Sequence, residues 1–300
     1  MNATVRHPRT IQIFLPTGDP TGLRIAEQTT SIMRVIEVPR RDLDQFLAMD
    51  EAAQVGLYFL VGGTDRDEIY IGQSSNVGSR IQQHHKEDKK DWERALVLVS
   101  LTQNLTQTHA LYLEYRSIET AKAYNRVRLI NGNKGQQPHT PPPLKADCEQ
   151  IHEICALLLA TLGYPFFEPL LKSAARPDAA AKDGQAREDA IFTLPRNGVD
   201  ARAIYTNEGM VVLKDSSFPY IAQTGTTPTH RIPLIEKCDE LLQKGVLKKE
   251  GGRCVFAQNH LFPTPSTAAS LLILGSANGW TEFKTAEGIT LKDHQGRSSD

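Results

Sequence analysis

The sequence lacks a long apolar run, a C-x-x-C pair and a strong excess of either charge. None of its apolar segments approaches the roughly 20 residues needed to cross a bilayer, so no membrane association is expected. The N-terminal stretch MNATVRHPRT has no apolar segment of signal-peptide length, which predicts a cytoplasmic protein. The spacing of the four cysteines fits neither a zinc site nor a disulfide framework and favours free thiols: Cys148, Cys155, Cys238 and Cys254.

The charge balance limits how this chain can bind a polyanion. It carries 34 Lys and Arg against 35 Asp and Glu, a formal net charge of −1. Binding of nucleic acid by bulk electrostatics is therefore excluded, and any such contact must be local. With 40% apolar and 23% charged residues in 300, the composition is that of a globular protein with two or three cores.

Alternating patterns and turn signals divide the chain into four segments and predict an α+β fold. We expect a β-rich unit at residues 1–50 and a small α/β domain at 51–135, with a central three-stranded antiparallel sheet flanked by helices. Residues 136–189 are predicted to be a helix and a flexible linker, the linker at Lys172–Glu188. Residues 190–300 are predicted to be a C-terminal α+β domain that closes with a strand at Trp280–Lys284. Trp280 and Phe283 are expected to be core residues rather than a platform for stacking on bases.

The second segment contains three predicted strands and two predicted helices. The strands are Val55–Val61, Ile69–Gln73 and Ala95–Leu101, and the first two form a hairpin. Ser74, Ser75 and Asn76 offer caps for a helix that contains Arg80, Ile81, His84 and His85. The charged run 86–90 that follows is expected to be exposed. A longer helix begins near Thr106, and Glu114 interrupts its apolar stripe.

Gly56-Leu57-Tyr58 and, after eleven intervening residues, Tyr70-Ile71-Gly72 stand on the two hairpin strands. With Arg80 and His84 on the next helix, Glu114 in the late helix and Asn131 or Asn133 after it, this region resembles the GIY-YIG nuclease family over about 80 residues. The resemblance implies a metal-dependent endonuclease that hydrolyses phosphodiester bonds in DNA, with Mg²⁺ or Mn²⁺ as cofactor. It implies catalytic roles for Tyr58, Tyr70, Arg80, His84 and Glu114, substrate contacts from Gly72 and Asn131, and metal binding by Glu114.

Phosphodiester hydrolysis requires an activated water and neutralisation of charge on the phosphoryl oxygens. The hairpin can place Tyr58 and Tyr70 side by side, so that their hydroxyls orient water or accept its proton. Which tyrosine is the base stays open, and both are alternatively core aromatics. Arg80 and His84 are four residues apart and share one helix face, where they can reach one phosphate together. The alternative is a solvated helix face. His85 points well away from the Arg80 direction and is the less favoured histidine of the pair.

A carboxylate inside an apolar stripe is costly unless something compensates it. For Glu114 the resemblance implies a divalent cation, and Mg²⁺ often takes one or two carboxylates and fills its remaining positions with water and phosphate oxygens. The alternative is an ion pair with Arg80 or Arg116. Asn131 follows a predicted strand and can place an amide beside the substrate backbone, although turn chemistry explains it equally well.

The C-terminal segment, with ARAIYTNEGMVVLKDS at 201–216 and SANGW at 276–280, resembles a small uncharacterised domain at the end of some prokaryotic nuclease and modification proteins. That resemblance implies no chemistry, and we expect the flanking domains to serve substrate recognition. A non-catalytic adaptor for nucleic acid or protein on the same fold is the other hypothesis, and it suits the near-neutral charge. Oligomeric state and the choice between DNA and RNA stay open.

Overall fold

The computed structural model describes residues 8–63, 67–87, 90–132, 137–171, 190–196, 198–221 and 227–296. The predicted linker at Lys172–Glu188 lies outside these residues. The chain is a mixed α+β protein, as predicted, and its contacts divide it into two compact units. Of the described residues, those from 8 to 169 form one unit and those from 170 to 296 form the other. Among the described residues, no helix combines the length and the apolar character that a membrane span requires.

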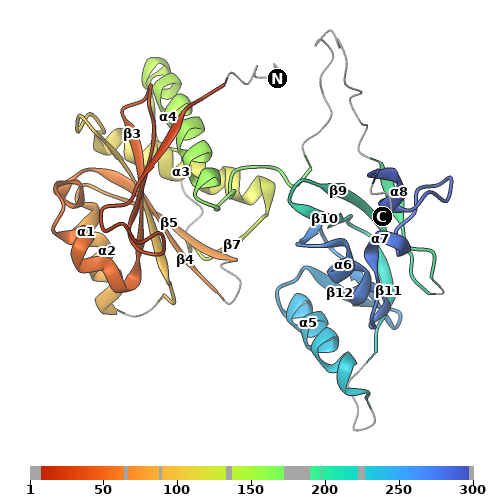
Figure 1. The fold of residues 1–300 in the computed structure, drawn as a ribbon. Coiled ribbons are helices and arrows are strands. Elements are labelled where there is room, and N and C mark those ends of the chain that lie inside the picture. Colours follow the sequence, from red (N-terminus) through yellow and green to blue (C-terminus); the bar gives the residue numbers. More distant parts are fainter. Residues whose placement is uncertain are drawn as a thin grey trace, which may run out of the picture. The chain divides into compact units, whose positions relative to one another are not determined.

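The N-terminal unit is built on one seven-stranded sheet in the order β1-β2-β3-β6-β4-β5-β7 (Figure 1). Every neighbouring pair is antiparallel except β5 and β7, which are parallel. The predicted antiparallel set of three strands is its β6-β4-β5 portion. The strands are β1 (Ile11–Phe14), β2 (Arg24–Gln28), β3 (Met33–Pro39), β4 (Gly56–Gly62), β5 (Glu68–Ser74), β6 (Arg94–Ser100) and β7 (Arg128–Leu129).

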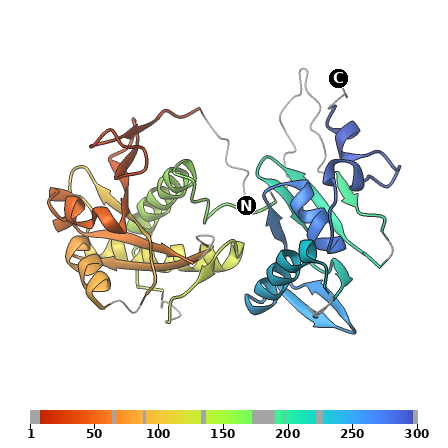
Figure 2. The ribbon, with the colours of Figure 1, turned by 60° about the horizontal axis from the view of Figure 1, so that its bottom comes forward.

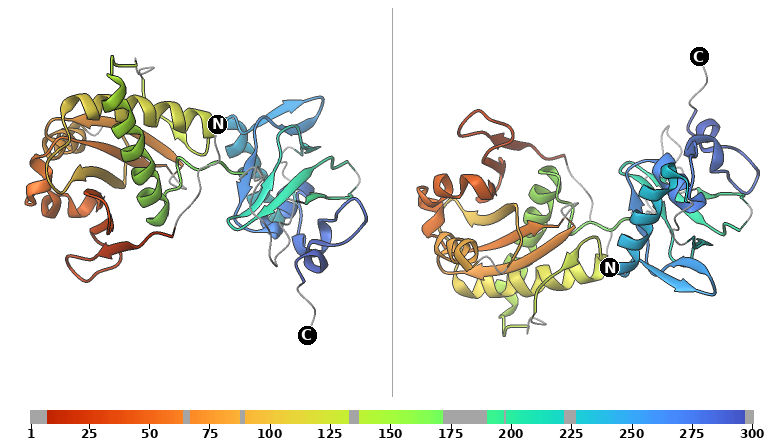
Figure 3. Two further views of the ribbon diagram at one scale, coloured as in Figure 1. Left: turned by 90° about the horizontal axis from the view of Figure 1, so that it is seen from above. Right: turned by 90° about the horizontal axis from the view of Figure 1, so that it is seen from below.

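Successive residues of the central strands point to opposite faces of the sheet, and each face is covered by its own helices (Figures 1 and 3). One face packs Leu57, Phe59 and Val61 against α3 (Gln107–Tyr124) and α4 (Pro142–Thr161). The other packs Tyr58 and Leu60 against α1 (Leu43–Leu47) and α2 (Val77–Glu87). Two 3₁₀ turns, η1 (Arg40–Asp42) and η2 (Asp50–Ala53), flank α1. Because both faces are covered, β4 is buried along its whole length.

Residues 11–39 contribute three strands to this sheet, and the predicted boundary near residue 50 falls inside the unit. β3 pairs with β6 along its full length, and β2 and β1 extend the sheet beyond it. Glu37 of β3 is fully buried and accepts hydrogen bonds from Arg24 Nε at 2.8 Å, Arg94 Nη1 at 3.0 Å and the Tyr164 hydroxyl at 2.9 Å. These bonds compensate the buried carboxylate and tie β2, β6 and the segment after α4 to β3.

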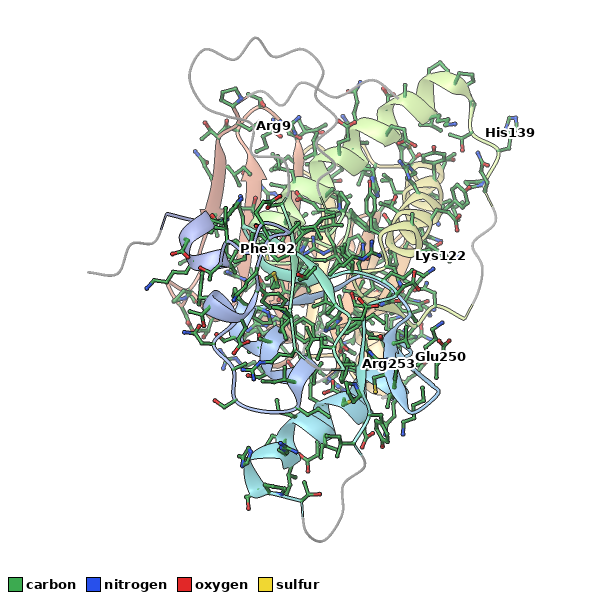
Figure 4. All side chains as sticks on the ribbon, turned by 90° about the vertical axis from the view of Figure 1, so that its right-hand side faces the viewer. Arg9, Lys122, His139, Phe192, Glu250 and Arg253 are labelled. Carbon is green, nitrogen blue, oxygen red and sulfur yellow. The ribbon has the colours of Figure 1, made fainter. Side chains whose placement is uncertain are left out.

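The C-terminal unit contains two further sheets, in the orders β14-β10-β9-β8 and β11-β13-β12 (Figure 2). Glu250 and Arg253 lie opposite each other across the β12–β13 pair and are labelled in Figure 4. All four cysteines of the chain are buried free thiols. The strands are β8 (Ile191–Thr193), β9 (Arg202–Thr206), β10 (Gly209–Val212), β11 (Ser217–Pro219), β12 (Leu247–Glu250), β13 (Arg253–Phe256) and β14 (His260–Phe262). The helices are η3 (Thr229–Arg231), α5 (Ile232–Gln243), α6 (Pro265–Ile273), α7 (Gly279–Glu282) and α8 (Leu291–His294).

The predicted strand at Trp280–Lys284 is wrong, because most of that segment belongs to the short helix α7. The Asn278 side chain accepts a hydrogen bond from the Trp280 backbone amide at 3.1 Å and caps the helix. Phe283 is fully buried, as expected of a core residue. Trp280 is half-buried and packs against Tyr205, with ring centroids 5.3 Å apart.

Candidate functional site

The β4–β5 hairpin brings the two predicted tyrosines together. The register pairs Tyr58 with Gly72 and Leu60 with Tyr70, so that both tyrosines project from the α2 side of the sheet. Their ring centroids are 6.2 Å apart. Gly72 is required by this packing, because a Cβ atom there would lie 2.4 Å from the Tyr58 hydroxyl oxygen and 2.5 Å from its Cζ. Gly72 therefore makes room for the tyrosine.

Helix α2 supplies the next two predicted residues from one face. The Asn76 side chain accepts a hydrogen bond from the Ser79 amide at 2.9 Å and caps the first turn, as the sequence predicts. One and two turns later, Arg80 is half-buried and His84 is only 3% exposed. This face is therefore not simply solvated. His85 points elsewhere, as expected, since its Nδ1 accepts a bond from Arg40 Nε at 3.2 Å.

His84 lies against both tyrosine rings and bonds to one of them. Its Nε2 is 2.9 Å from the Tyr58 hydroxyl oxygen. The His84 ring centroid lies 5.7 Å from that of Tyr58 and 5.3 Å from that of Tyr70. The Arg80 guanidinium interacts with the hydroxyls of both tyrosines. Two strands and one helix therefore bring four polar side chains to one place.

Lys90 completes the cluster, and the sequence analysis did not anticipate it. Its Nζ lies 3.0 Å from His84 Nδ1 and 4.1 Å from the centroid of the Tyr70 ring. The expectation that residues 86–90 are exposed holds for Lys86 and Glu87 and is wrong for Lys90, which is half-buried. Helical periodicity could not have found it, because Lys90 follows the last residue of α2.

The outer edge of β5 positions the remaining two candidates. Alternate residues of this strand direct their backbone groups away from β4. Ile69 O accepts a bond from the Ile130 amide, next to β7. The Asn131 side chain then pairs with the next outward residue: its Oδ1 accepts from Ile71 N at 2.9 Å, and its Nδ2 donates to Ile71 O at 2.7 Å. Asn131 thus continues the β7 pairing and supports the strand that carries Tyr70.

The backbone amide of Gln73, the next outward residue of β5, acts on Glu114 of α3 and lowers the pKa of its carboxyl. β7 and Asn131 pair with the earlier part of this edge of β5. The Gln73 amide lies beyond them on the same edge and faces the Glu114 carboxylate. From this position Glu114 acts electrostatically on Tyr58 and raises its pKa. The structure therefore places the late-helix carboxylate at the outer edge of β5, within electrostatic range of Tyr58.

The predicted alternative of an ion pair for Glu114 is not seen among the described residues. Arg116 pairs instead with Glu149, at 3.0 Å, and Arg80 bonds to Gln83. Burial raises the pKa of the Glu114 carboxyl, and the Gln73 amide offsets part of that effect. A half-buried carboxylate that pairs with no cationic side chain of the described segments suits a divalent cation that completes its coordination with water and phosphate oxygens. Within the described ranges no group of three potential His, Cys, Asp or Glu ligands is found, so a cation here would take fewer than three such side chains from the protein.

Burial sets the protonation states of the other two groups. It raises the pKa of Tyr58 above the ordinary value of 10, and Tyr70 adds to this, while Arg80 opposes it. It lowers the pKa of His84 to about 4, with Lys90 and Arg80 contributing and Glu87 opposing. His84 is therefore a neutral imidazole at pH 7, and Tyr58 is a phenol in the free site.

A family model described as "Domain of unknown function (DUF4357)" matches residues 192–295. The matched stretch covers most of the predicted C-terminal domain and supports a small domain at this end of the chain. Comparison of the chain with curated proteins and with solved structures gave no significant match.

Proposed function

We propose that the N-terminal unit is a metal-assisted endonuclease of the GIY-YIG type that hydrolyses phosphodiester bonds in DNA. The observation that carries this proposal is the convergence of Tyr58, Tyr70, Arg80, His84 and Glu114, drawn from two strands and two helices, at one end of β5. An adaptor protein has no need of a carboxylate beside a polyanion, whereas a hydrolase that uses a cation does.

Each residue has a role that follows from its surroundings. Arg80 is a permanent cation beside both hydroxyls, and we assign to it the neutralisation of charge on the phosphoryl oxygens. Tyr58 and Tyr70 orient the attacking water, and one of them, once its own phenolic proton has passed to solvent, receives the proton of that water. Glu114 would hold the divalent cation, which supplies charge stabilisation to the phosphate and lowers the pKa of bound water when it is present.

His84 acts through Tyr58 in this proposal. A group with a pKa of about 4 is a poor proton donor at pH 7, and both ring nitrogens have partners, Tyr58 on Nε2 and Lys90 on Nδ1. We therefore assign to His84 the orientation of the Tyr58 hydroxyl rather than direct proton transfer with the substrate. Asn131 supports β5, and Gly72 admits the Tyr58 ring, so both serve the site through the strand.

The decisive experiment is the nicking of supercoiled plasmid by the full-length protein with Mg²⁺ or Mn²⁺. We expect nicking by the wild type, none by Glu114→Ala, and a rate reduced by about 100-fold or more in Arg80→Ala, the usual effect of removing one group that stabilises developing charge. His85→Gln is the matched control, because this neighbouring histidine is exposed and faces Arg40. Its rate should equal that of the wild type.

The outcome that refutes the proposal is a pure wild type that cleaves neither plasmid, branched DNA nor RNA with either cation. Binding of nucleic acid without cleavage would then favour the adaptor. Nicking that persists in Glu114→Ala would exclude the assigned carboxylate. Parallel assays on DNA and RNA of one sequence decide which polymer is the substrate.

A further inference from the structure

Lys90 has no role in the site described so far, yet it contacts two of its members. The ammonium lies over the Tyr70 ring face, 4.1 Å from the centroid, a favourable position for a cation on an aromatic ring. From there Nζ reaches His84 Nδ1 at 3.0 Å. The Tyr70 ring thus positions the Lys90 ammonium, and the ammonium in turn positions Nδ1 of His84.

The direction of this hydrogen bond is set by chemistry. A lysine ammonium has three donors and no acceptor, so Nδ1 must be the acceptor and carries no proton. The His84 side chain is almost completely buried beside two cations, Lys90 and Arg80, with Glu87 as the opposing charge. Such surroundings keep the imidazole neutral. Its single proton therefore resides on Nε2.

The tautomer of His84 also sets the direction of its hydrogen bond to Tyr58. Nε2 lies 2.9 Å from the Tyr58 oxygen, and an Nε2–H group donates to it. The Tyr58 oxygen thus accepts from His84 and interacts with the Arg80 guanidinium, which is also only a donor. The phenol therefore directs its own proton away from His84, and Arg80 offsets part of the burial that raises the pKa of Tyr58.

We propose that Lys90 is a positioning residue that holds His84 in the Nε2–H tautomer and so makes the Tyr58 oxygen a hydrogen-bond acceptor in the free protein. Without Lys90, the opposite tautomer of His84 becomes accessible. The Tyr58 hydroxyl then donates its hydrogen bond to Nε2 and no longer accepts one from His84. The assignment of a catalytic consequence to this tautomer rests on the proposed nuclease function, but the tautomer itself does not.

The test uses the full-length protein labelled with ¹⁵N-histidine. Long-range ¹H–¹⁵N spectra at pH 7 distinguish a protonated from an unprotonated ring nitrogen, and the signal that disappears in His84→Gln assigns His84 among the nine histidines. We expect unprotonated Nδ1 and protonated Nε2 in the wild type. In Lys90→Met, which keeps an apolar contact with the Tyr70 ring, the Nδ1–H tautomer should appear.

Two matched variants separate this effect from a general loss of structure. Lys86→Met removes an exposed lysine from α2 and should leave the His84 spectrum unchanged. Lys90→Arg keeps a donor-only cation and should restore the Nε2–H tautomer. Thermal melts of all three variants verify that they fold; if Lys90→Met does not fold, Lys90→Leu, which also lacks a donor, takes its place. Protonated Nδ1 in the wild type, or a Lys90→Met spectrum identical to that of the wild type, would overturn the proposal.

The rate of plasmid nicking tests the consequence separately. Lys90→Met should lower the single-turnover rate by about tenfold, the lower end of the effect of losing a group that orients an active-site ligand, and Lys90→Arg should recover most of it. An altered tautomer with an unchanged rate would overturn the positioning role. A wild type without nuclease activity would refute the proposed function, while the spectra would still decide the tautomer.

Discussion

Replacing Gly72 with alanine should displace Tyr58 without removing any polar group from the site. The new Cβ atom would lie 2.4 Å from the Tyr58 hydroxyl oxygen, whereas ordinary van der Waals contact begins at 3.4 Å. The hydroxyl must therefore move by about 1 Å. A shift of that size away from His84 would break the 2.9 Å contact with Nε2.

The same clash sets the expected magnitudes. Overpacking at a buried position costs about 1–3 kcal/mol of stability. Misplacing a reacting group by about 1 Å can cost about 100-fold in rate. Gly72→Ala should consequently remain folded, with a lowered melting temperature, and should nick plasmid about 100 times more slowly than the wild type.

Two comparisons make the result interpretable. Gly56→Ala introduces a similar clash, with the Leu98 carbonyl oxygen at 2.5 Å, and should lower the melting temperature while retaining far more activity. In a Tyr58→Phe background the displaced hydroxyl is absent, so Gly72→Ala should have little further effect on the rate. A Gly72→Ala protein with the wild-type rate, or an undiminished effect in the Tyr58→Phe background, would refute the displacement of Tyr58 as the cause.

Three further variants follow from the site. Because burial raises the pKa of Glu114, the ionised carboxylate present at pH 7 costs the fold some stability; Glu114→Gln should abolish nicking and raise the free energy of unfolding at pH 7 in denaturant titrations. The His84 pKa of about 4 lies below the ordinary 6.5, so the wild type loses stability as pH falls from about 6.5 to about 4. His84→Gln should remove up to about 3 kcal/mol of that loss. The same dependence of unfolding free energy on pH in both proteins would contradict this expectation. Asn131→Ala leaves the backbone of Ile71 unpaired and should cost about 1–3 kcal/mol, with Mg²⁺ binding by calorimetry weakened far less than in Glu114→Gln; a fully stable variant would exclude the strand-support role.

Local sequence patterns predict the position of several residues of the candidate site. The alternation of β4 and β5 places residues 58, 70 and 72 on one face of the hairpin, and four-residue spacing places Arg80 and His84 on one face of α2. A carboxylate inside an apolar helical stripe signalled that Glu114 needs a partner. These relations depend on neighbours in sequence, so the sequence alone could predict them.

Long-range pairing and residues outside regular elements were not predictable in this way. Nothing in residues 11–39 indicates that β3 pairs with β6, because strand patterns do not name a partner. Lys90 follows the end of α2, and its position depends on the Tyr70 ring rather than on periodicity. At Trp280 the Asn278-Gly279 turn signal predicts a strand, but the Asn278 side chain caps a short helix there instead.

The near-neutral charge of the chain does not describe the charge of its candidate site. Around the two tyrosines the described cationic groups are Arg80 and Lys90, His84 is neutral at pH 7, and Glu114 lies at the far edge of β5. A phosphate that approaches the tyrosine hydroxyls meets two cations, and a divalent cation on Glu114 would reverse the sign of the remaining charge. A net charge of −1 over 300 residues is thus compatible with a locally positive site, and raising the salt concentration should weaken substrate binding with a shallow slope that reflects few phosphate contacts in this unit.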